Sequence, residues 1–112
     1  MPNKNDKASM FLYYWKIYAP QGFLPVGEYE FARVIGRKFR FDLAWTQYRI
    51  GVEVDGGGWL PHGGRHGGDG DREKLNIAAS LRWLVFRFSP AMLERNPAGC
   101  IDMVLKAIKD SQ

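Results

Sequence analysis

Three acidic side chains, Asp42, Glu53 and Asp55, are the residues of this sequence whose spacing points most directly to chemistry. Apolar and polar residues alternate over 39–46 and again over 48–55, which predicts the two strands of a hairpin. Because strand side chains point alternately to the two faces, any even shift in the pairing keeps all three carboxylates on one face. Like charges repel, so such a patch is stable mainly with a cation between the acids, and oxygen ligands favour Mg²⁺ or Mn²⁺.

The turn between these strands decides how the acids face one another. A turn centred on residues 46 and 47 pairs Asp42 with Gly51, so that Asp42 lies diagonal to Glu53 at about 7–8 Å. The same pairing puts Arg40 opposite Glu53, and a cross-strand ion pair worth on the order of a few tenths of a kcal/mol would also explain Glu53. Periodicity alone therefore leaves two interpretations open, a metal site and an ordinary ion pair.

The elements that would position these acids follow from periodicity, caps and turns. They are a helix at about 9–18, a strand at 28–34, the hairpin, a helix at 71–82, a strand at 83–88 and a helix at about 97–109. Because a helix joins 48–55 to the nearly all-apolar 83–88, these two strands are expected to pair in parallel. The apolar side chains expected on one face of the first hairpin strand are Phe39, Phe41, Leu43 and Trp45. The predicted fold is α/β, with a mixed central β-sheet of antiparallel hairpins and one parallel βαβ crossover, flanked by helices.

The composition indicates one small globular domain over 1–112. The 112 residues are 46% hydrophobic and 25% charged, which excludes a disordered chain. A single cysteine excludes a disulfide framework and fits a reducing compartment, so we expect a cytoplasmic protein. No apolar run approaches the roughly 20 residues of a membrane helix, and we expect neither a membrane segment nor a signal peptide. A net charge of +4 hints at a polyanionic partner, although a solvated basic face would explain it as well.

Several short motifs resemble those of a known enzyme family in order and spacing. They are Phe39-Arg40-Phe41-Asp42-Leu43-Ala44-Trp45, Val52-Glu53-Val54-Asp55-Gly56-Gly57, the pair Arg65-His66, the helix containing Lys74-Leu75-Asn76, and Trp83-Leu84-Val85-Phe86-Arg87-Phe88. Over about residues 28–90 the chain resembles the PD-(D/E)XK nucleases, and more closely the small phage and bacterial endonuclease-like proteins akin to very-short-patch-repair (Vsr-like) endonucleases. The resemblance implies a restriction-endonuclease-like fold and a Mg²⁺- or Mn²⁺-dependent endonuclease that hydrolyses DNA. A glycine that such proteins often carry before the tryptophan is Arg82 in this sequence.

The resemblance also implies roles for individual residues. Asp42 would be the central metal ligand, Glu53 the second acid, and the carbonyl of Val54 would complete the inner shell. Asp55, a further candidate ligand, stands where the family name has a lysine, which is a departure from the pattern. A lysine there would orient the attacking water and stabilise charge in the transition state. Related families often move that role to the following helix, where Lys74 is the candidate. A surface pair with Asp71, three residues earlier on the same helix, would explain Lys74 as well.

Further residues complete the predicted site. His66 is expected to act as a general acid or base or as a phosphate contact, as a histidine does in the patch-repair relatives. Glu28 or Glu30 would replace an acid that many relatives supply from an N-terminal helix. The expected DNA contacts are Arg37, Lys38, Arg40, Trp59, Arg65 and Arg87. A homodimer would suit an enzyme that cuts both strands.

Other interpretations stay open at this point. A non-catalytic nucleic-acid-binding module that kept the fold would bind DNA regardless of Mg²⁺, and its acids would be paired with Arg40 and Arg49. The protein would also fit as a subunit of a larger phage or repair assembly. His62 and His66 have a zinc-like spacing, but no second pair of ligands lies near them in the sequence.

Overall fold

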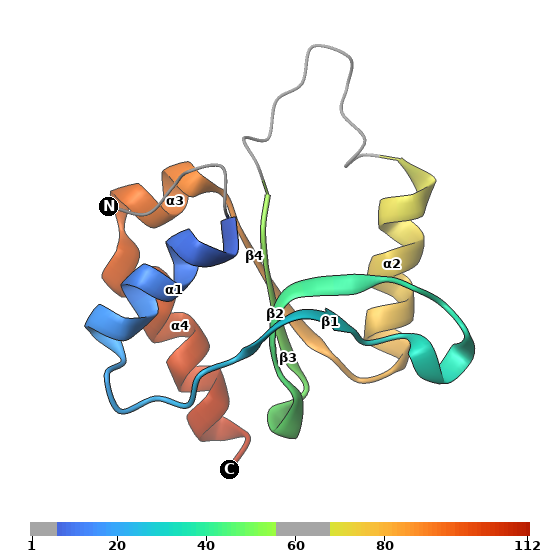
Figure 1. Ribbon diagram of the computed structural model, residues 1–112, viewed down its shortest axis with the longest axis horizontal. Coiled ribbons are helices and arrows are strands. Elements are labelled where there is room, and N and C mark those ends of the chain that lie inside the picture. Colours follow the sequence, from blue (N-terminus) through green and yellow to red (C-terminus); the bar gives the residue numbers. More distant parts are fainter. Residues whose placement is uncertain (1–6, 56–67) are drawn as a thin grey trace.

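The protein is built around one four-stranded sheet with helices on both faces, as the computed structural model shows for residues 7–55 and 68–112 (Figure 1). Its elements are α1 (Lys7–Tyr18), β1 (Val26–Glu30), a 3₁₀ helix (Arg33–Ile35), β2 (Arg40–Trp45), a second 3₁₀ helix (Thr46–Tyr48), β3 (Ile50–Val54), α2 (Asp69–Ser80), β4 (Leu84–Phe88), α3 (Pro90–Arg95) and α4 (Pro97–Asp110). The predicted α/β class is confirmed. Within the described ranges, no helix has the length and apolar character that crossing a membrane requires.

The strands lie in the order β1-β2-β3-β4, with two antiparallel pairs and one parallel pair. The parallel pair is β3 with β4, joined through α2, so the predicted strand–helix–strand unit is confirmed. Its consequence is that the carboxyl end of β3 and the amino end of α2 lie toward the same edge of the sheet (Figure 1). Residues on these two element ends can therefore meet in space.

The pairing of β2 with β3 differs from the predicted one by two residues. Ala44, not Asp42, lies opposite Gly51, and the ladder ends at the pair Leu43 and Val52. The connection is longer than expected because the 3₁₀ helix Thr46–Tyr48 and Arg49, in the left-handed conformation with φ 54°, extend it. The shift is even, so by itself it moves no side chain to the other face, but Arg40 is paired with Glu30 of β1 rather than placed opposite Glu53.

The alternation of β2 breaks at Asp42. Leu43 and Trp45 pack into the larger core, as expected, whereas Phe41 packs on the opposite face of the sheet with Ala44. The prediction that Phe41 shares a face with Leu43 is therefore wrong. A Cβ at Gly51 would lie 2.6 Å from the Phe41 ring, so the ring can cross β3 only because a glycine stands there.

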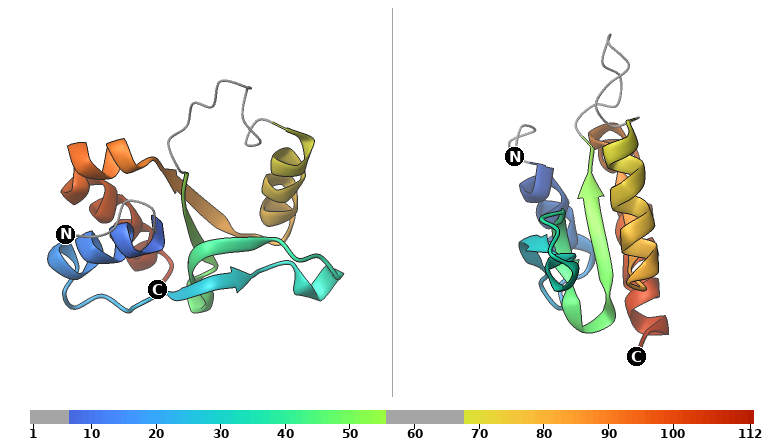
Figure 2. Two further views of the ribbon diagram at one scale, coloured as in Figure 1. Left: turned by 45° about the horizontal axis from the view of Figure 1, so that its top comes forward. Right: turned by 90° about the vertical axis from the view of Figure 1, so that its right-hand side faces the viewer.

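Two hydrophobic clusters fill the two faces of the sheet. Helices α1, α3 and α4 cover one face, and α2 covers the other (Figure 2). Helix α3 was not predicted, because its six residues are too few to show a helical period. Ser89 caps it by accepting a hydrogen bond from the Met92 N–H at 3.1 Å. The predicted cap of α4 is confirmed, since Asn96 accepts from the Gly99 N–H at 3.1 Å.

Helix α2 ends in a Schellman-type turn. The Trp83 N–H donates to the Ala78 carbonyl at 2.9 Å, and the Arg82 N–H donates to the Ala79 carbonyl at 3.0 Å. Arg82 takes the left-handed conformation, with φ 67°, that this turn requires and that glycine adopts most easily. Arg49 adds a further cap, since its Nη1 donates to the Leu81 carbonyl at 2.7 Å.

Candidate active site

Asp42 lies where β2 separates from β3. Beyond the last ladder pair, its side chain replaces a backbone partner, and Oδ2 accepts a hydrogen bond from the Val54 N–H at 2.8 Å. The bond fixes the carboxylate in the gap between the two strands, next to the end of β3. Asp42 lies near enough to Glu53 for its charge to act on the Glu53 carboxyl group.

Glu53 is buried, with only 9% of its surface exposed, and no other charged residue in the described ranges is buried. Burial raises the pKa of its carboxyl group, the nearby Asp42 charge raises it further, and the hydrogen bond from Lys74 opposes both effects. An ionised carboxylate is costly to bury unless a cation accompanies it. Among the described residues, Glu53 is therefore the group whose environment most favours a bound positive charge.

Lys74 supplies a positive charge from α2. Its Nζ forms an ion pair with Glu53 Oε1, and the same Nζ lies 5.9 Å from the centre of the Phe41 ring. Ala78, which is buried, follows four residues later on the same helix face, so the helical period directs Lys74 toward the sheet. The sequence left Lys74 either in this role or as a surface partner of Asp71; the structure places it against Glu53.

Asp55 does not join the other two acids. Arg87, the β4 residue level with Glu53, holds it: Nη2 lies 3.1 Å from Asp55 Oδ2, and Nη1 lies 3.2 Å from Asp71 Oδ2 on α2. In residues 7–55 and 68–112, no three His, Cys, Asp or Glu side chains are grouped as metal ligands would be. The structure thus brings Asp42 and Glu53 together and ties Asp55 to Arg87.

The donor atoms present still fit a hard divalent cation. Asp42 and Glu53 offer carboxylate oxygens, and Val54, the residue after Glu53, has a backbone carbonyl oxygen. The set of donor atoms therefore contains oxygen only. Among the described residues, Lys74 forms an ion pair with Glu53, no ion pair is seen for Asp42, and Arg87 is shared with Asp55 and Asp71, so the acids outnumber the cations here. Mg²⁺ or Mn²⁺ would neutralise the excess negative charge of the carboxylates.

The predicted DNA contacts fall into distinct environments. Lys38 and Arg40 are exposed. Arg40 Nη1 on β2 lies 3.8 Å from Glu28 Oε2 on the neighbouring strand β1. Arg37 makes two hydrogen bonds to Glu73 on α2, at 2.6 and 3.0 Å. Arg87 is enclosed between two acids, so its charge is already matched within the protein.

Two further predictions can be placed. Glu28 pairs with Arg40, and Glu30 lies on β1 opposite Arg40, so neither reaches the acids of β2 and β3 through any contact seen among the described residues. Arg49 caps α2 instead of pairing with an acid. The ion-pair interpretation required Arg40 and Arg49 as partners of the acids; the partners found are Lys74 and Arg87. Trp59, Arg65, His62 and His66 lie outside the described residues.

The part played by Asp71 was missed. The sequence suggested a favourable interaction of Asp71 with the helix dipole, or a surface pair with Lys74, whereas its side chain binds Arg87. Its spacing of three residues from Lys74 was the available signal, because residues three apart share a helix face. Lys74 and Asp71 together carry both polar contacts of α2 to the strands beneath it.

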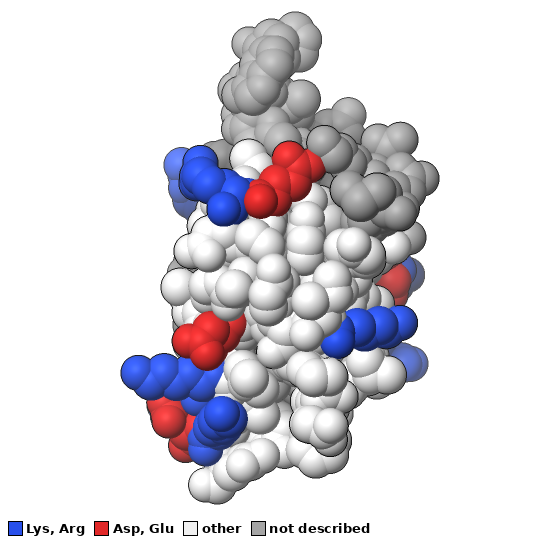
Figure 3. Space-filling model, turned by 90° about the vertical axis from the view of Figure 1, so that its left-hand side faces the viewer, with Lys and Arg blue, Asp and Glu red and all other residues white. Residues whose placement is uncertain are grey.

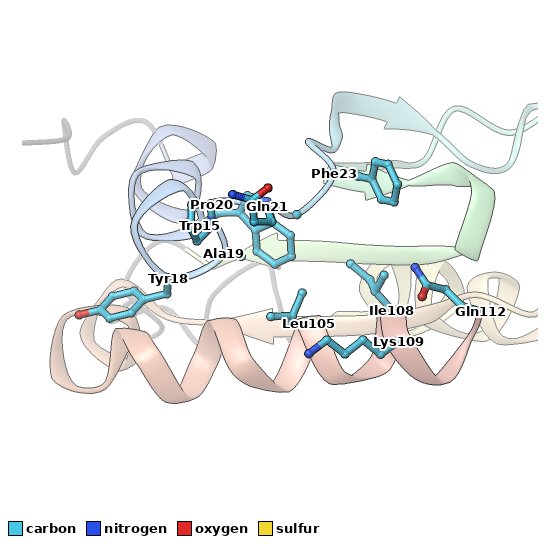
Figure 4. Close-up of a pocket in the computed structure, with 11 residues that line it drawn as sticks. Trp15, Tyr18, Ala19, Pro20, Gln21, Phe23, Leu105, Ile108, Lys109 and Gln112 are labelled. Carbon is cyan, nitrogen blue, oxygen red and sulfur yellow. The ribbon is translucent and has the colours of Figure 1, made fainter.

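A hollow of about 300 Å³ lies on the opposite face of the sheet, between the end of α1 and the end of α4 (Figure 4). Its wall is mainly apolar: Trp15, Ala19, Phe23, Leu105 and Ile108, with Lys109 at the side. It lacks paired acids and bases for hydrolytic chemistry, so the site on the α2 face remains the stronger candidate.

Comparison with known proteins gave no guide to the site. No family model matches the chain, and neither the curated proteins nor the solved structures contain a significant match. The case for function therefore stands on the Asp42 and Glu53 pair, on Lys74, and on the elements that hold them.

Proposed function

We propose that the protein is a Mg²⁺-dependent endonuclease that hydrolyses DNA phosphodiester bonds and belongs to the PD-(D/E)XK group. The observation that carries the proposal is the buried Glu53, which lies near Asp42 and is contacted by Lys74 from the following helix. Acid, acid and lysine occur in that order along the chain, as the motif has them, with the lysine moved to the helix. The net charge of +4 suits a polyanionic substrate.

Each residue of the site would have a separate role in the reaction. Asp42, Glu53 and the carbonyl of Val54 would hold the ion, which when bound supplies positive charge to the phosphate and makes water more acidic. Lys74 donates a hydrogen bond to Glu53 and keeps further N–H donors, which can orient a water molecule or contact a phosphate oxygen. The hydrogen bond from Val54 holds the Asp42 carboxylate in one orientation, and such positioning accounts for much of the rate in phosphoryl chemistry.

Energetics favour a functional over a structural role for this cluster. An exposed ion pair is worth about 0–1 kcal/mol, whereas burying a charged group costs several kcal/mol before its partner compensates. Apolar side chains in place of Glu53 and Lys74 would fill the space without that cost. A buried acid beside a second acid is therefore expensive for folding alone, and a site that binds a cation explains why both are present.

The decisive experiment is a cleavage assay on supercoiled, linear, branched and mismatched DNA, with Mg²⁺ or with EDTA. The variants Asp42→Asn and Glu53→Gln keep shape and hydrogen-bonding capacity but remove the charge. We expect Mg²⁺-dependent cleavage by the native protein and a loss of about 10²-fold or more in each variant. Asp102→Asn, which removes an exposed carboxylate on α4, is the matched control and should cleave normally.

Two outcomes would overturn the proposal. One is cleavage by both variants at the native rate while circular dichroism shows all three proteins folded. The other is DNA binding that is equal in Mg²⁺ and EDTA and is never followed by cleavage, which would favour a non-catalytic nucleic-acid-binding module with this fold.

A further inference from the structure

The tip of the β1–β2 hairpin, residues 33–38, exposes two aliphatic side chains. Val34 is 80% exposed and Ile35 50% exposed, and both belong to the 3₁₀ helix Arg33–Ile35. Gly36 follows in the left-handed conformation, with φ 75°, and turns the chain back toward β2. Figures 1 and 2 show this tip at a corner of the molecule, away from the helices that pack on the other face. Neither aliphatic side chain contributes to the core.

Cations surround this pair. Arg33 precedes it, Arg37 and Lys38 follow it, and together with Glu30 and Gly36 they line an open hollow of about 470 Å³. Arg33 and Lys38 are exposed and make no ion pair with another described residue, so their charges are available to a partner. Two exposed aliphatic side chains flanked by cations suit the binding of a polyanion that also carries apolar groups.

The tip is also fixed relative to the candidate site. The two hydrogen bonds from Arg37 to Glu73 tie it to α2, and Lys74 is the next residue along that helix. The guanidinium of Arg37 lies 4.7 Å from the centre of the Phe39 ring, which stiffens the base of the hairpin. The tip and Lys74, the ion-pair partner of Glu53, are thus connected through the same helix.

We infer that the hairpin tip binds duplex DNA, with Val34 and Ile35 pressed between base pairs from a groove and with Arg33 and Lys38 on the flanking phosphates. Proteins that combine an apolar wedge with basic residues in this way partly unstack and kink the duplex. The inference rests on the proposed function, because it takes DNA as the substrate. An anionic membrane is the weaker alternative, since two short side chains bury far less than the one acyl chain that already gives only marginal anchoring.

Bending of a short duplex labelled with a dye at each end tests the inference, by resonance energy transfer in EDTA so that no cleavage occurs. Native protein should raise the transfer efficiency on binding. The double variant Val34→Ser/Ile35→Ser should still bind, about tenfold more weakly, and leave the transfer near that of free DNA. Because both positions are exposed, the variant should fold; Met103→Ser, 55% exposed on α4, is the matched control and should bend DNA as the native protein does.

The variant Arg33→Gln/Lys38→Gln tests the phosphate contacts separately. The dependence of binding on salt should weaken, with the slope of log affinity against log salt falling by about two, one for each lost contact. Equal bending by native protein and the Val34→Ser/Ile35→Ser variant would overturn the inference. So would native binding without bending, or tip-dependent binding to phosphatidylserine vesicles in place of DNA.

The results of this test and of the cleavage assay can be told apart. Mg²⁺-dependent cleavage combined with bending that ignores the tip would leave the proposed activity standing and remove the wedge. Tip-dependent bending without cleavage under any divalent cation would support the wedge and remove the nuclease.

Discussion

The two faces of the sheet are built on different principles. On one face, α1, α3 and α4 pack an aromatic core in which Phe11 contacts Trp15, Trp45 and Phe88 with ring centres about 6 Å apart. The outer surface of these helices carries charges mainly near its margins (Figure 3). On the other face, α2 alone covers a smaller cluster around Phe41 and meets the strands through ion pairs. The larger apolar core thus lies on one face of the sheet, and the enclosed charged side chains lie on the other.

This division has a physical reason. Apolar burial is the main favourable term in folding, and the aromatic face supplies most of it here. The α2 face can then carry a buried carboxylate and an enclosed Arg87, whose Nε has no hydrogen-bond partner among the described residues. Mutations on the two faces should accordingly separate stability from activity.

The largest expected effect is on the aromatic face. Phe11→Ala removes a fully buried ring from the centre of that core and should lower the free energy of unfolding by about 3–5 kcal/mol. Urea denaturation followed by tryptophan fluorescence measures it. Val34→Ala, at the exposed tip, should change stability by less than about 0.5 kcal/mol. If Phe11→Ala cost no more than Val34→Ala, the assignment of stability to the aromatic face would be wrong.

On the α2 face, replacing Lys74 should lower the free energy of unfolding, because the buried Glu53 then lacks its ion-pair partner. Lys74→Met leaves Glu53 without its ion-pair partner and should cost about 2–4 kcal/mol. The double variant Glu53→Leu/Lys74→Met removes both charges and should recover most of that loss, while cleavage stays absent. A double variant as unstable as Lys74→Met would show that the pair is chiefly structural and would weaken the contrast between the faces.

The raised pKa of Glu53 gives the same face a pH signature. The native carboxyl holds its proton to higher pH than the unfolded one, whose ordinary value is 4.5. The contribution of Glu53 to the free energy of unfolding is therefore complete below pH 4.5 and is lost as the pH rises through the native pKa. Relative to Glu53→Gln, the native protein should lose stability over this range in urea titrations at a series of pH values. A difference between the two proteins that does not vary with pH would show that burial does not perturb Glu53.

A smaller effect is expected where α2 is tied to the ends of β3 and β4. Arg87→Met leaves Asp55 and Asp71 without the guanidinium that bridges them. Because these side chains are partly exposed, the loss should be about 1–3 kcal/mol, smaller than for a fully enclosed pair. Arg72→Met breaks only an exposed ion pair on α2 and should leave the thermal midpoint almost unchanged. Equal shifts of the thermal midpoint in the two variants would show that Arg87 does not stabilise the protein by bridging Asp55 and Asp71.

The sequence predicted the strand faces of the acids better than their contacts. A register shift of two residues leaves the parity of the pairing, and with it the expected face of Glu53, unchanged. The break at Asp42 was beyond such reasoning, since it coincides with a hydrogen bond that the Asp42 side chain accepts from Val54 on another strand. Likewise, the capture of Asp55 by Arg87 depends on how β4 lies beside β3, which no local pattern encodes.

The smallest prediction concerns the residue that links α2 to β4. Arg82 occupies a left-handed turn position that costs an L-residue about 1–2 kcal/mol, and glycine would remove that cost while adding some freedom to the unfolded chain. Arg82→Gly should therefore raise the free energy of unfolding by about 0.5–1 kcal/mol. Gly36→Ala is the matched reverse change: φ is 75° with open space around it, so strain alone should destabilise it by a similar amount. Because Arg82 contacts neither Glu53 nor Lys74, cleavage should not change, and a loss of cleavage in Arg82→Gly would mean that the site depends on strain at the end of α2.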